Sequence, residues 1–205
     1  MSTISIIGSG SMAAAIGGLA AKAGHTVEMM SRDAAKARAL AEQVGAGATT
    51  GTFGAAPAGD IVVLAVPYSA VLDLVKQYGK ELAGKLLVDI TNPVASDHTS
   101  FVTPGDSSGA QEIAKAAPAS AHVVKGFNTL FRDVLAAGGP LDVFMAGDDA
   151  QAKASVSAFI TSLGLRPQDT GDLSMAHWLE GAGLLAVGVG RGAGDFNFSL
   201  GVKFG

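Results

Sequence analysis

Apolar and polar positions along the chain follow two alternating patterns. Short runs of β-branched and other apolar residues, typical of buried strands, are each followed by a longer stretch with helical periodicity. The first three strands are expected at 3–8, 26–30 and 60–67, and the helices after them at 11–23, 33–44 and 69–78. This order of strand and helix is typical of a parallel sheet joined by crossover connections.

The alternation continues to the end of the chain. Residues 47–60 contain many Gly, Pro and Thr, which favours a short strand and a connection over a full helix. Further strands are expected at 85–91, 122–128, 141–149 and 165–170, and further helices at 108–117, 150–163 and 175–189. No linker interrupts the pattern, so we expect one domain over 1–205, with a core at 1–137 and a C-terminal extension of the same sheet at 138–205.

Composition limits the classes of partner. Of the 205 residues 48% are hydrophobic and 16% charged, which allows a sizeable core. The net charge of -4 gives no electrostatic footprint for nucleic acid or an anionic membrane, so small molecules are the expected partners. There is no cysteine, hence no disulfide and no thiolate nucleophile. Residues 1–24 lack a cationic start and no apolar run reaches ~20 residues, so we expect a cytoplasmic protein without membrane spans.

A glycine turn directly after the first strand carries the first chemical signal. The sequence Gly8-Ser9-Gly10-Ser11-Met12-Ala13 is G-x-G-x-x-A at the start of a helix, a variant of the dinucleotide-binding fingerprint. Gly8 permits the tight turn, Gly10 lets a pyrophosphate approach the main chain, and Ala13 lets the helix lie close to the sheet. The turn predicts an α/β fold of the Rossmann type: a doubly wound, mainly parallel sheet with a short C-terminal α/β extension.

The end of the second strand indicates which dinucleotide binds. NAD-binding proteins usually present Asp or Glu about twenty residues after the turn, but here Ser31 and Arg32 follow the strand, with Lys36 on the next helix. A hydroxyl and cations suit the 2′-phosphate of NADP. Two alternatives remain: a solvated, charged helix start, or Asp33 as a displaced ribose ligand.

Residues just after the later strands are expected to line the ligand crevice, because parallel strands end at one edge of the sheet. They include small polar groups and prolines among apolar neighbours, as expected around a nicotinamide ring. The cofactor-binding candidates at these strand ends are Val66, Pro67, Tyr68, Asn92, Pro93, Asn128 and Thr129.

No side chain is assigned a catalytic role. The sequence contains no Ser-His-Asp arrangement, metal-ligand spacing or convincing carboxylate pair, and hydride transfer requires none of them because the cofactor carries the reaction. His25, His98 and His122 are interpreted as structural. His177 beside Trp178 either lines an acceptor site or packs at the edge of the core.

Seven segments, taken in order, resemble the 8-hydroxy-5-deazaflavin:NADPH oxidoreductase family. They are "GSGSMA", "MMSRDAAKA", "VVLAVP", "TNP", "VVKGFNTL", "GLRPQDTGDL" and the closing "LGVKFG". The resemblance implies a compact Rossmann fold, usually dimeric, that passes hydride between NADP(H) and a deazaflavin stacked on the nicotinamide. It also implies NADP binding by Ser9, Ser31, Arg32 and Lys36.

One residue beside the expected acceptor departs from the family pattern. Archaeal members that use deazaflavin tend to carry histidine where this sequence has Asn128, and "KGFNT" is more similar to the cytosolic domains of the six-transmembrane metalloreductases. Deazaflavin, flavin and ferric chelate therefore all remain open as acceptors. Lys125 or Asn128 touches the acceptor in one interpretation; in another, Lys125 reaches solvent from its strand end.

The resulting prediction is an NADPH-dependent oxidoreductase that transfers hydride between NADP(H) and a deazaflavin or flavin. The alternatives are a metalloreductase-type ferric or flavin reductase, and a non-catalytic NADP(H) sensor. Dehydrogenases with a long helical domain fit poorly, because only about 65 residues follow the strand at 122–128 and its loop. A homodimer is expected, with Leu184, Leu185, Val187 and Val189 of the terminal helix available for its interface.

Overall fold

A computed structural model describes residues 1–192 of the chain. The "LGVKFG" segment of the family resemblance lies outside the described residues. The strands are β1 Thr3–Ile7, β2 Thr26–Met30, β3 Thr49–Thr50, β4 Ile61–Leu64, β5 Leu86–Asp89, β6 His122–Lys125, β7 Asp142–Gly147 and β8 Arg166–Asp169. The α-helices are α1 Ser11–Lys22, α2 Ala34–Val44, α3 Tyr68–Tyr78, α4 Gly109–Ala116, α5 Arg132–Ala137, α6 Ala150–Ser162 and α7 Ala176–Gly192, with short 3-10 turns at Gly79–Leu82 and Leu173–Met175.

All eight strands belong to one sheet, in the order β3-β2-β1-β4-β5-β6-β7-β8. Each neighbouring pair is parallel except β6 and β7, which pair antiparallel. The order reverses direction at β1 and β4, which makes the gap between these strands the switch point where ligands bind in such folds. The predicted doubly wound, mainly parallel Rossmann-like sheet with a C-terminal extension is confirmed.

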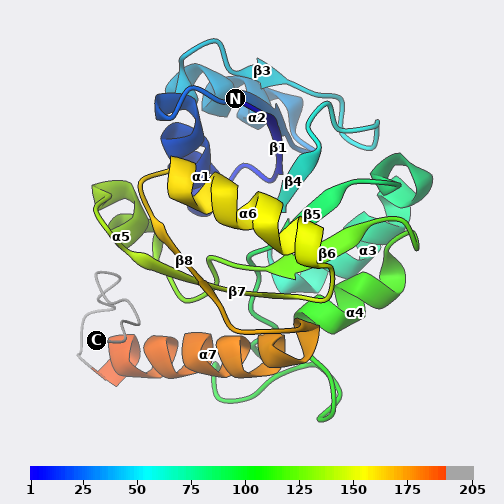
Figure 1. Cartoon of the computed structure of the whole chain (residues 1–205), viewed down its shortest axis with the longest axis vertical. Coiled ribbons are helices and arrows are strands. Elements are labelled where there is room, and N and C mark those ends of the chain that lie inside the picture. The colour runs from blue at the N-terminus through cyan, green and yellow to red at the C-terminus, as the bar shows by residue number, and fades with distance from the viewer. Residues whose placement is uncertain (193–205) are drawn as a thin grey trace.

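Helices cover both faces of the sheet (Figure 1). Apolar residues of α1, α2, α5 and α6 pack on one face, with Ile4, Ile6 and Val63 among their strand partners. α3 and α4 pack on the other face, against Ile7 and Leu64. β1 (from Ile4), β4 and β5 are buried at every position, which explains their nearly continuous apolar runs.

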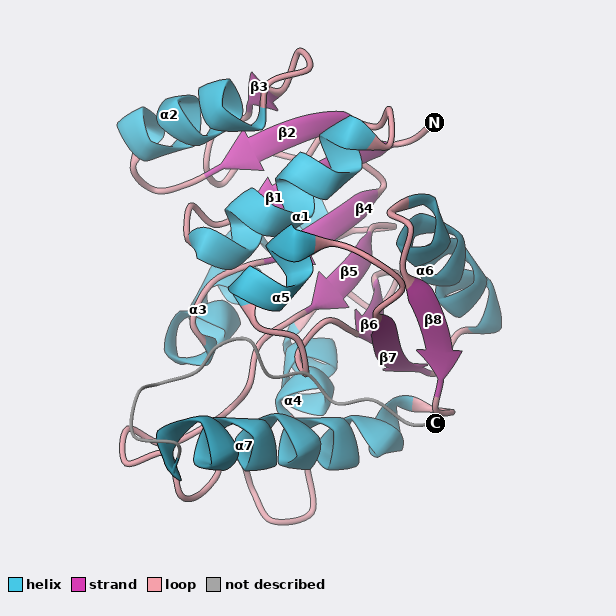
Figure 2. Cartoon of the chain, turned by 90° about the vertical axis from the view of Figure 1, so that its left-hand side faces the viewer, coloured by secondary structure: helices cyan, strands magenta, loops and turns pink. Residues whose placement is uncertain are grey.

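α7 lies beside the C-terminal half of the sheet, as Figure 2 shows from the side. Leu179 packs against Phe144 and Ala146 of β7, and Arg191 near the other end of the helix donates a hydrogen bond to the Asp97 carbonyl at 2.6 Å. α7 thereby bridges the strand extension and the loop after β5.

The sequence missed one helix and overextended several strands. α5 was not expected, because its six residues are too few to show a helical period. β3 has only two residues, and β4, β5 and β6 end two or three residues before the expected ends. Within the part of the chain that is described, no helix is both long and apolar enough to cross a membrane.

Candidate functional site

Two cavities lie on either side of the glycine turn, at the carboxyl edge of the sheet. The first, about 430 Å³, is lined by Ile7, Gly8, Ser9, Gly10, Ser31, Arg32, Phe53, Ala65, Val66, Pro67, Ser69, Ala70, Asp73, Leu74 and Gln77. The second, about 390 Å³, is lined by Ser11, Met12, Ile90, Asn92, Phe127, Asn128, Leu130, Phe131, Arg132 and Asp133. Gly10 lines the first cavity and the next residue, Ser11, lines the second, so the two cavities flank the same turn. An elongated ligand could therefore cross the turn and occupy both.

The turn has the geometry that the glycine pattern predicts. Gly8 has a φ of +141°, and a Cβ there would lie 2.0 Å from the Ala65 carbonyl oxygen, so no other residue fits without a shift. A Cβ on Gly10 would meet no atom within 4 Å, because this position faces the first cavity. Ala13, in the first turn of α1, is fully buried in the core between this helix and the sheet. A ligand in the first cavity can therefore approach the main chain of Gly10 directly.

The amino end of α1 is left free for an anion. Its N-cap, Gly10, provides no side-chain hydrogen bond, and the first turn holds no acidic residue. By contrast, the side chains of Asp33, Ser108 and Asp149 cap α2, α4 and α6. The unpaired N–H groups and the positive dipole end of α1 suit a pyrophosphate.

Hydroxyls and a guanidinium meet at the tip of β2. The Oγ atoms of Ser9 and Ser31 lie 3.1 Å apart, and Arg32 lines the same cavity with no hydrogen bond or ion pair to any described residue. The Asp33 carboxylate instead accepts hydrogen bonds from the N–H groups of Ala35 and Lys36, at 3.0 and 3.1 Å. Asp33 is therefore engaged in capping α2, which argues against its alternative role as a ribose ligand.

The other cations of α2 lie outside this cavity. Lys36 is exposed and does not line it, and Arg38 borders a separate depression beside β3. Of the cations near the strand end, only Arg32 lines the first cavity.

One face of α3 forms a wall that the sequence interpretation missed. Asp73, Leu74 and Gln77 line the first cavity together with Phe53 from the loop after β3. Ala70, Asp73, Leu74 and Gln77 follow the i, i+3, i+4, i+7 spacing of a single helix face. This spacing could have revealed the wall from the sequence, because the helix that follows a parallel strand often borders the ligand crevice.

Tyr68, Pro93 and Thr129 were predicted to bind the cofactor but line neither cavity. The Tyr68 ring packs against α4, where a Cβ on Gly109 would lie 2.8 Å from it. Burial, reinforced by nearby carboxylates including that of Glu112, raises the pKa of Tyr68 to about 12. The phenol is therefore neutral at physiological pH.

Asn92 and Asn128 connect the ends of β5 and β6 in the second cavity. The Asn128 side-chain amide donates to Asn92 Oδ1 at 2.9 Å and to the Leu179 carbonyl of α7 at 2.8 Å. Asn92 Nδ2 donates in return to the Asn128 carbonyl at 2.9 Å. Phe127, which is fully buried, has a φ of +60°, an unfavourable conformation for a bulky residue. This surrounding network holds the strained backbone in place.

A buried ion triad lies behind this network. Lys125 is fully buried, with its Nζ 2.8 Å from Asp89 and 2.9 Å from Glu180, and it donates to the Thr91 carbonyl at 2.5 Å. Glu180 also accepts hydrogen bonds from the N–H groups of Gly109 and Ala110 at the start of α4. Lys125 therefore neither touches the second cavity nor reaches solvent, and both sequence interpretations of this residue were wrong. It fastens α7 and α4 to the sheet.

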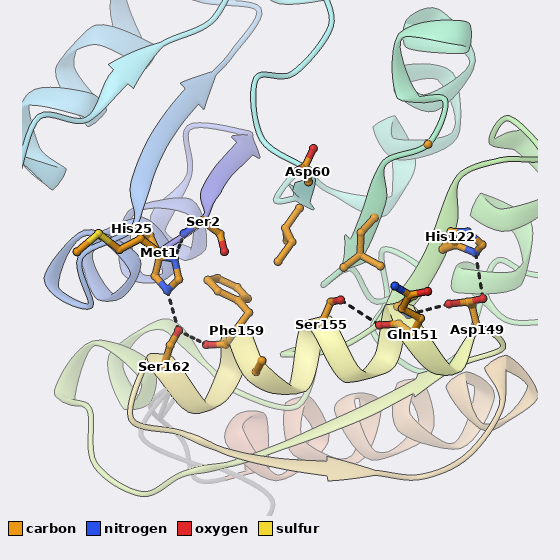
Figure 3. A pocket seen from close by; sticks show the side chains of 15 residues that line it. Met1, Ser2, His25, Asp60, His122, Asp149, Gln151, Ser155, Phe159 and Ser162 are labelled. Atoms are coloured by element: carbon orange, nitrogen blue, oxygen red, sulfur yellow. Dashed lines mark hydrogen bonds and ion pairs between the residues drawn. The ribbon is translucent and has the colours of Figure 1, made fainter.

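A larger cavity, about 640 Å³, lies at the opposite edge of the sheet, along α6 (Figure 3). His25 there accepts a hydrogen bond from the N–H of Ser2 at 3.2 Å, and its Nε2 lies 2.7 Å from the Ser162 hydroxyl. His122 lies 3.9 Å from Asp149. These contacts agree with structural roles for both histidines, and the cavity lies away from every predicted cofactor residue.

His177 packs within an aromatic group at the first turn of α7. Its ring makes edge contacts with Phe101 and Trp178, at centroid distances of 5.9 and 5.3 Å. It lines neither cavity at the carboxyl edge. This placement matches packing at the edge of the core.

The parallel sheet, the glycine turn and the open amino end of α1 define a protein of the Rossmann class. Within this class, residues 3–93 match the family model described as NADP oxidoreductase, coenzyme F420-dependent. This part of the chain is similar to that family, and the resemblance found in the sequence is confirmed.

Three similar proteins support the assignment. The F420-dependent NADP reductase of Methanocaldococcus jannaschii is 32% identical over 143 residues, 66% of this chain and 64% of that protein. Metalloreductase STEAP3 of Rattus norvegicus is 34% identical over 123 residues, 58% of this chain and 23% of that protein. The matched regions thus span less than two thirds of either relative. A crystal structure from Arthrobacter sp. FB24, provisionally described as an F420-dependent NADP reductase, superposes over 100% of both chains with a TM-score of 0.85 and 27% identity.

Proposed function

We propose that the protein is an NADPH-dependent oxidoreductase that transfers hydride between NADP(H) and a deazaflavin or flavin. The free Arg32 guanidinium in the first cavity, beside the Ser9 and Ser31 hydroxyls, is the observation that carries this proposal. A cation that forms no internal ion pair is ready to bind a 2′-phosphate, whereas a carboxylate would repel it.

Other groups at the carboxyl edge of the sheet suit the pyrophosphate, adenosine and nicotinamide parts of NADP(H). The bare main chain of Gly10 and the uncapped start of α1 would receive the pyrophosphate. The α3 wall, with Phe53, would border the adenosine. Ser11, Met12 and Asn92 would border the nicotinamide half, which crosses the turn into the second cavity.

The bound cofactor would supply the hydride, and the protein would contribute orientation and exclusion of water. Ile90, Phe127 and Leu130 give the second cavity an apolar lining. The amides of Asn92 and Asn128 are held by their mutual hydrogen bonds, so the cavity wall is fixed before a ligand enters. No side chain is required as an acid or base in this scheme.

The similar proteins support deazaflavin first and flavin second as the acceptor. Relatives described as F420-dependent NADP reductases match most of the chain, and F420 is a deazaflavin. The similarity to a metalloreductase supports flavin as a second acceptor, and ferric ion as a third.

Acceptor turnover tests this proposal directly. Purified protein and NADPH are mixed with deazaflavin F420, FMN, FAD or a ferric chelate, and the nicotinamide absorbance is followed. We expect rapid oxidation of NADPH with deazaflavin or a flavin and none without an acceptor. Tight NADPH binding without oxidation by any acceptor would contradict an enzymatic role and favour a sensor.

We further propose a cytoplasmic homodimer. Trp178, Leu185 and Val189 of α7 are 67%, 73% and 60% exposed, an unusual degree of exposure for large apolar side chains on one helix. Sedimentation equilibrium should give twice the chain mass, and Leu185→Glu should give the monomer.

A further inference from the structure

One cation lines the second cavity. Arg132 begins α5 at its border, and the other lining residues are apolar or neutral except for Asp133. The amides of Asn92 and Asn128 are engaged with one another and with Leu179. Arg132 is therefore the group with the most hydrogen-bonding capacity left for a ligand in this cavity.

The ion pair between Arg132 and Asp133 occupies only part of the guanidinium group. Arg132 Nε and Nη2 both contact Asp133 Oδ1, at 2.7 and 2.6 Å. Nη1, with two N–H donors, has no partner among the described residues. The Arg132 side chain is 52% exposed, so the pair with Asp133 is worth little in itself, but it fixes the direction of the free edge.

Apolar and aromatic groups occupy the rest of the lining. Phe127, Phe131, Leu130 and Ile90 surround a space suited to a flat ring system rather than to a hydrated metal chelate. A planar acceptor that carried an anionic side chain would satisfy both parts of the cavity.

We propose that Arg132 binds a phosphate on the side chain of the electron acceptor, so that the acceptor class is a phosphorylated flavin-type ring. This inference rests on the proposed function and narrows its acceptor. A phosphate carries more charge than a single carboxylate and accepts paired N–H donors, so it can engage Nη1 while Asp133 stays in place. Arg132 acts here as a specificity residue and takes no part in hydride transfer.

FMN and riboflavin test the proposal, because they differ only in the 5′-phosphate. Binding of each to protein saturated with NADP⁺ is measured by calorimetry, and turnover with NADPH is measured in parallel. We expect FMN to bind about tenfold more tightly than riboflavin to the native protein, as for an exposed charge-assisted contact. Higher ionic strength should reduce this difference.

Variants assign the effect to one side chain. Arg132→Ala should bring FMN to the affinity of riboflavin while leaving riboflavin binding and NADPH affinity unchanged, and Arg132→Lys should retain part of the preference. Arg38→Ala is the control: it removes an exposed arginine that borders another depression, and it should change the affinity for neither FMN nor riboflavin.

Equal affinities of FMN and riboflavin for the native protein would overturn the proposal. A loss of NADPH affinity in Arg132→Ala as large as the loss for FMN would also overturn it, because Arg132 would then serve the cofactor. If FMN binds preferentially through Arg132 but is not reduced, this proposal stands and the proposed function fails for that acceptor.

Discussion

The two cavities beside the glycine turn differ in what their polar groups do. In the first cavity, Arg32 has no internal ion pair, and the start of α1 has no cap. In the wall of the second cavity, Asn92 and Asn128 bond to each other, and behind this wall Lys125 is enclosed by two carboxylates.

The first cavity is therefore suited to recognise its ligand by charge, and the second by shape. A cavity with free donors selects a ligand by its phosphates, so its specificity can be inferred from residue types. A cavity whose amide N–H groups already donate within the protein selects by its apolar outline, with Arg132 as the exception. The cofactor is therefore better defined by the structure than the acceptor is.

The largest expected effect is on the buried ion triad behind the second cavity. Lys125→Met leaves Asp89 and Glu180 as buried, unpaired carboxylates, so the free energy of unfolding should fall by ~3–5 kcal/mol. Urea denaturation followed by circular dichroism measures the loss. Lys85→Met is the control. Lys85 Nζ lies 3.8 Å from the fully exposed carboxylate of Asp60, so this substitution should lower the free energy of unfolding by at most ~1 kcal/mol. Equal losses would refute the structural role of the triad.

Arg32→Ala should act on the first cavity alone. Because Arg32 is exposed and has no partner in the described structure, its loss should leave the unfolding free energy nearly unchanged. Losing a charge-assisted contact costs ~1.5–3 kcal/mol, so NADPH should bind roughly ten- to a hundredfold more weakly. NADH, which lacks the 2′-phosphate, should keep its dissociation constant. Calorimetry with both nucleotides decides, and an equal loss for the two would defeat the assignment.

Asp33→Ala gives the smallest effect and tests the alternative ribose ligand. Loss of the α2 cap should reduce the unfolding free energy by ~1 kcal/mol. The affinity for NADH should not fall, because the carboxylate faces the helix. Asp149→Ala, which removes the cap of α6 far from the cavity, is the matched control for stability. A selective drop in NADH affinity in Asp33→Ala would restore the ribose role.

Local signals predicted much of the fold and the first cavity. The strands, the glycine turn and the Ser31-Arg32 pair depend on short stretches of chain, where periodicity and residue type suffice. The capping role of Asp33 was also accessible, because Asp before a helix is a common N-cap.

Long-range contacts explain what the sequence could not predict. The partners of Lys125 come from β5 and from α7, 36 residues before it and 55 residues after it, so the triad has no local signature. Tyr68 and Thr129 follow strands that end at this edge, but their side chains line neither cavity, and the Tyr68 ring packs against α4 instead. α5, which supplies Arg132, was too short to detect.

Calorimetric titration of the native protein with 2′,5′-ADP and with 5′-AMP tests the central claim most directly. The two ligands share the adenosine and the 5′-phosphate and differ in the 2′-phosphate, and both lack the nicotinamide half that would enter the second cavity. Binding of 2′,5′-ADP at least ~10-fold tighter than 5′-AMP is the result that the free Arg32 guanidinium predicts. Equal affinities, or binding of neither ligand, would contradict the account.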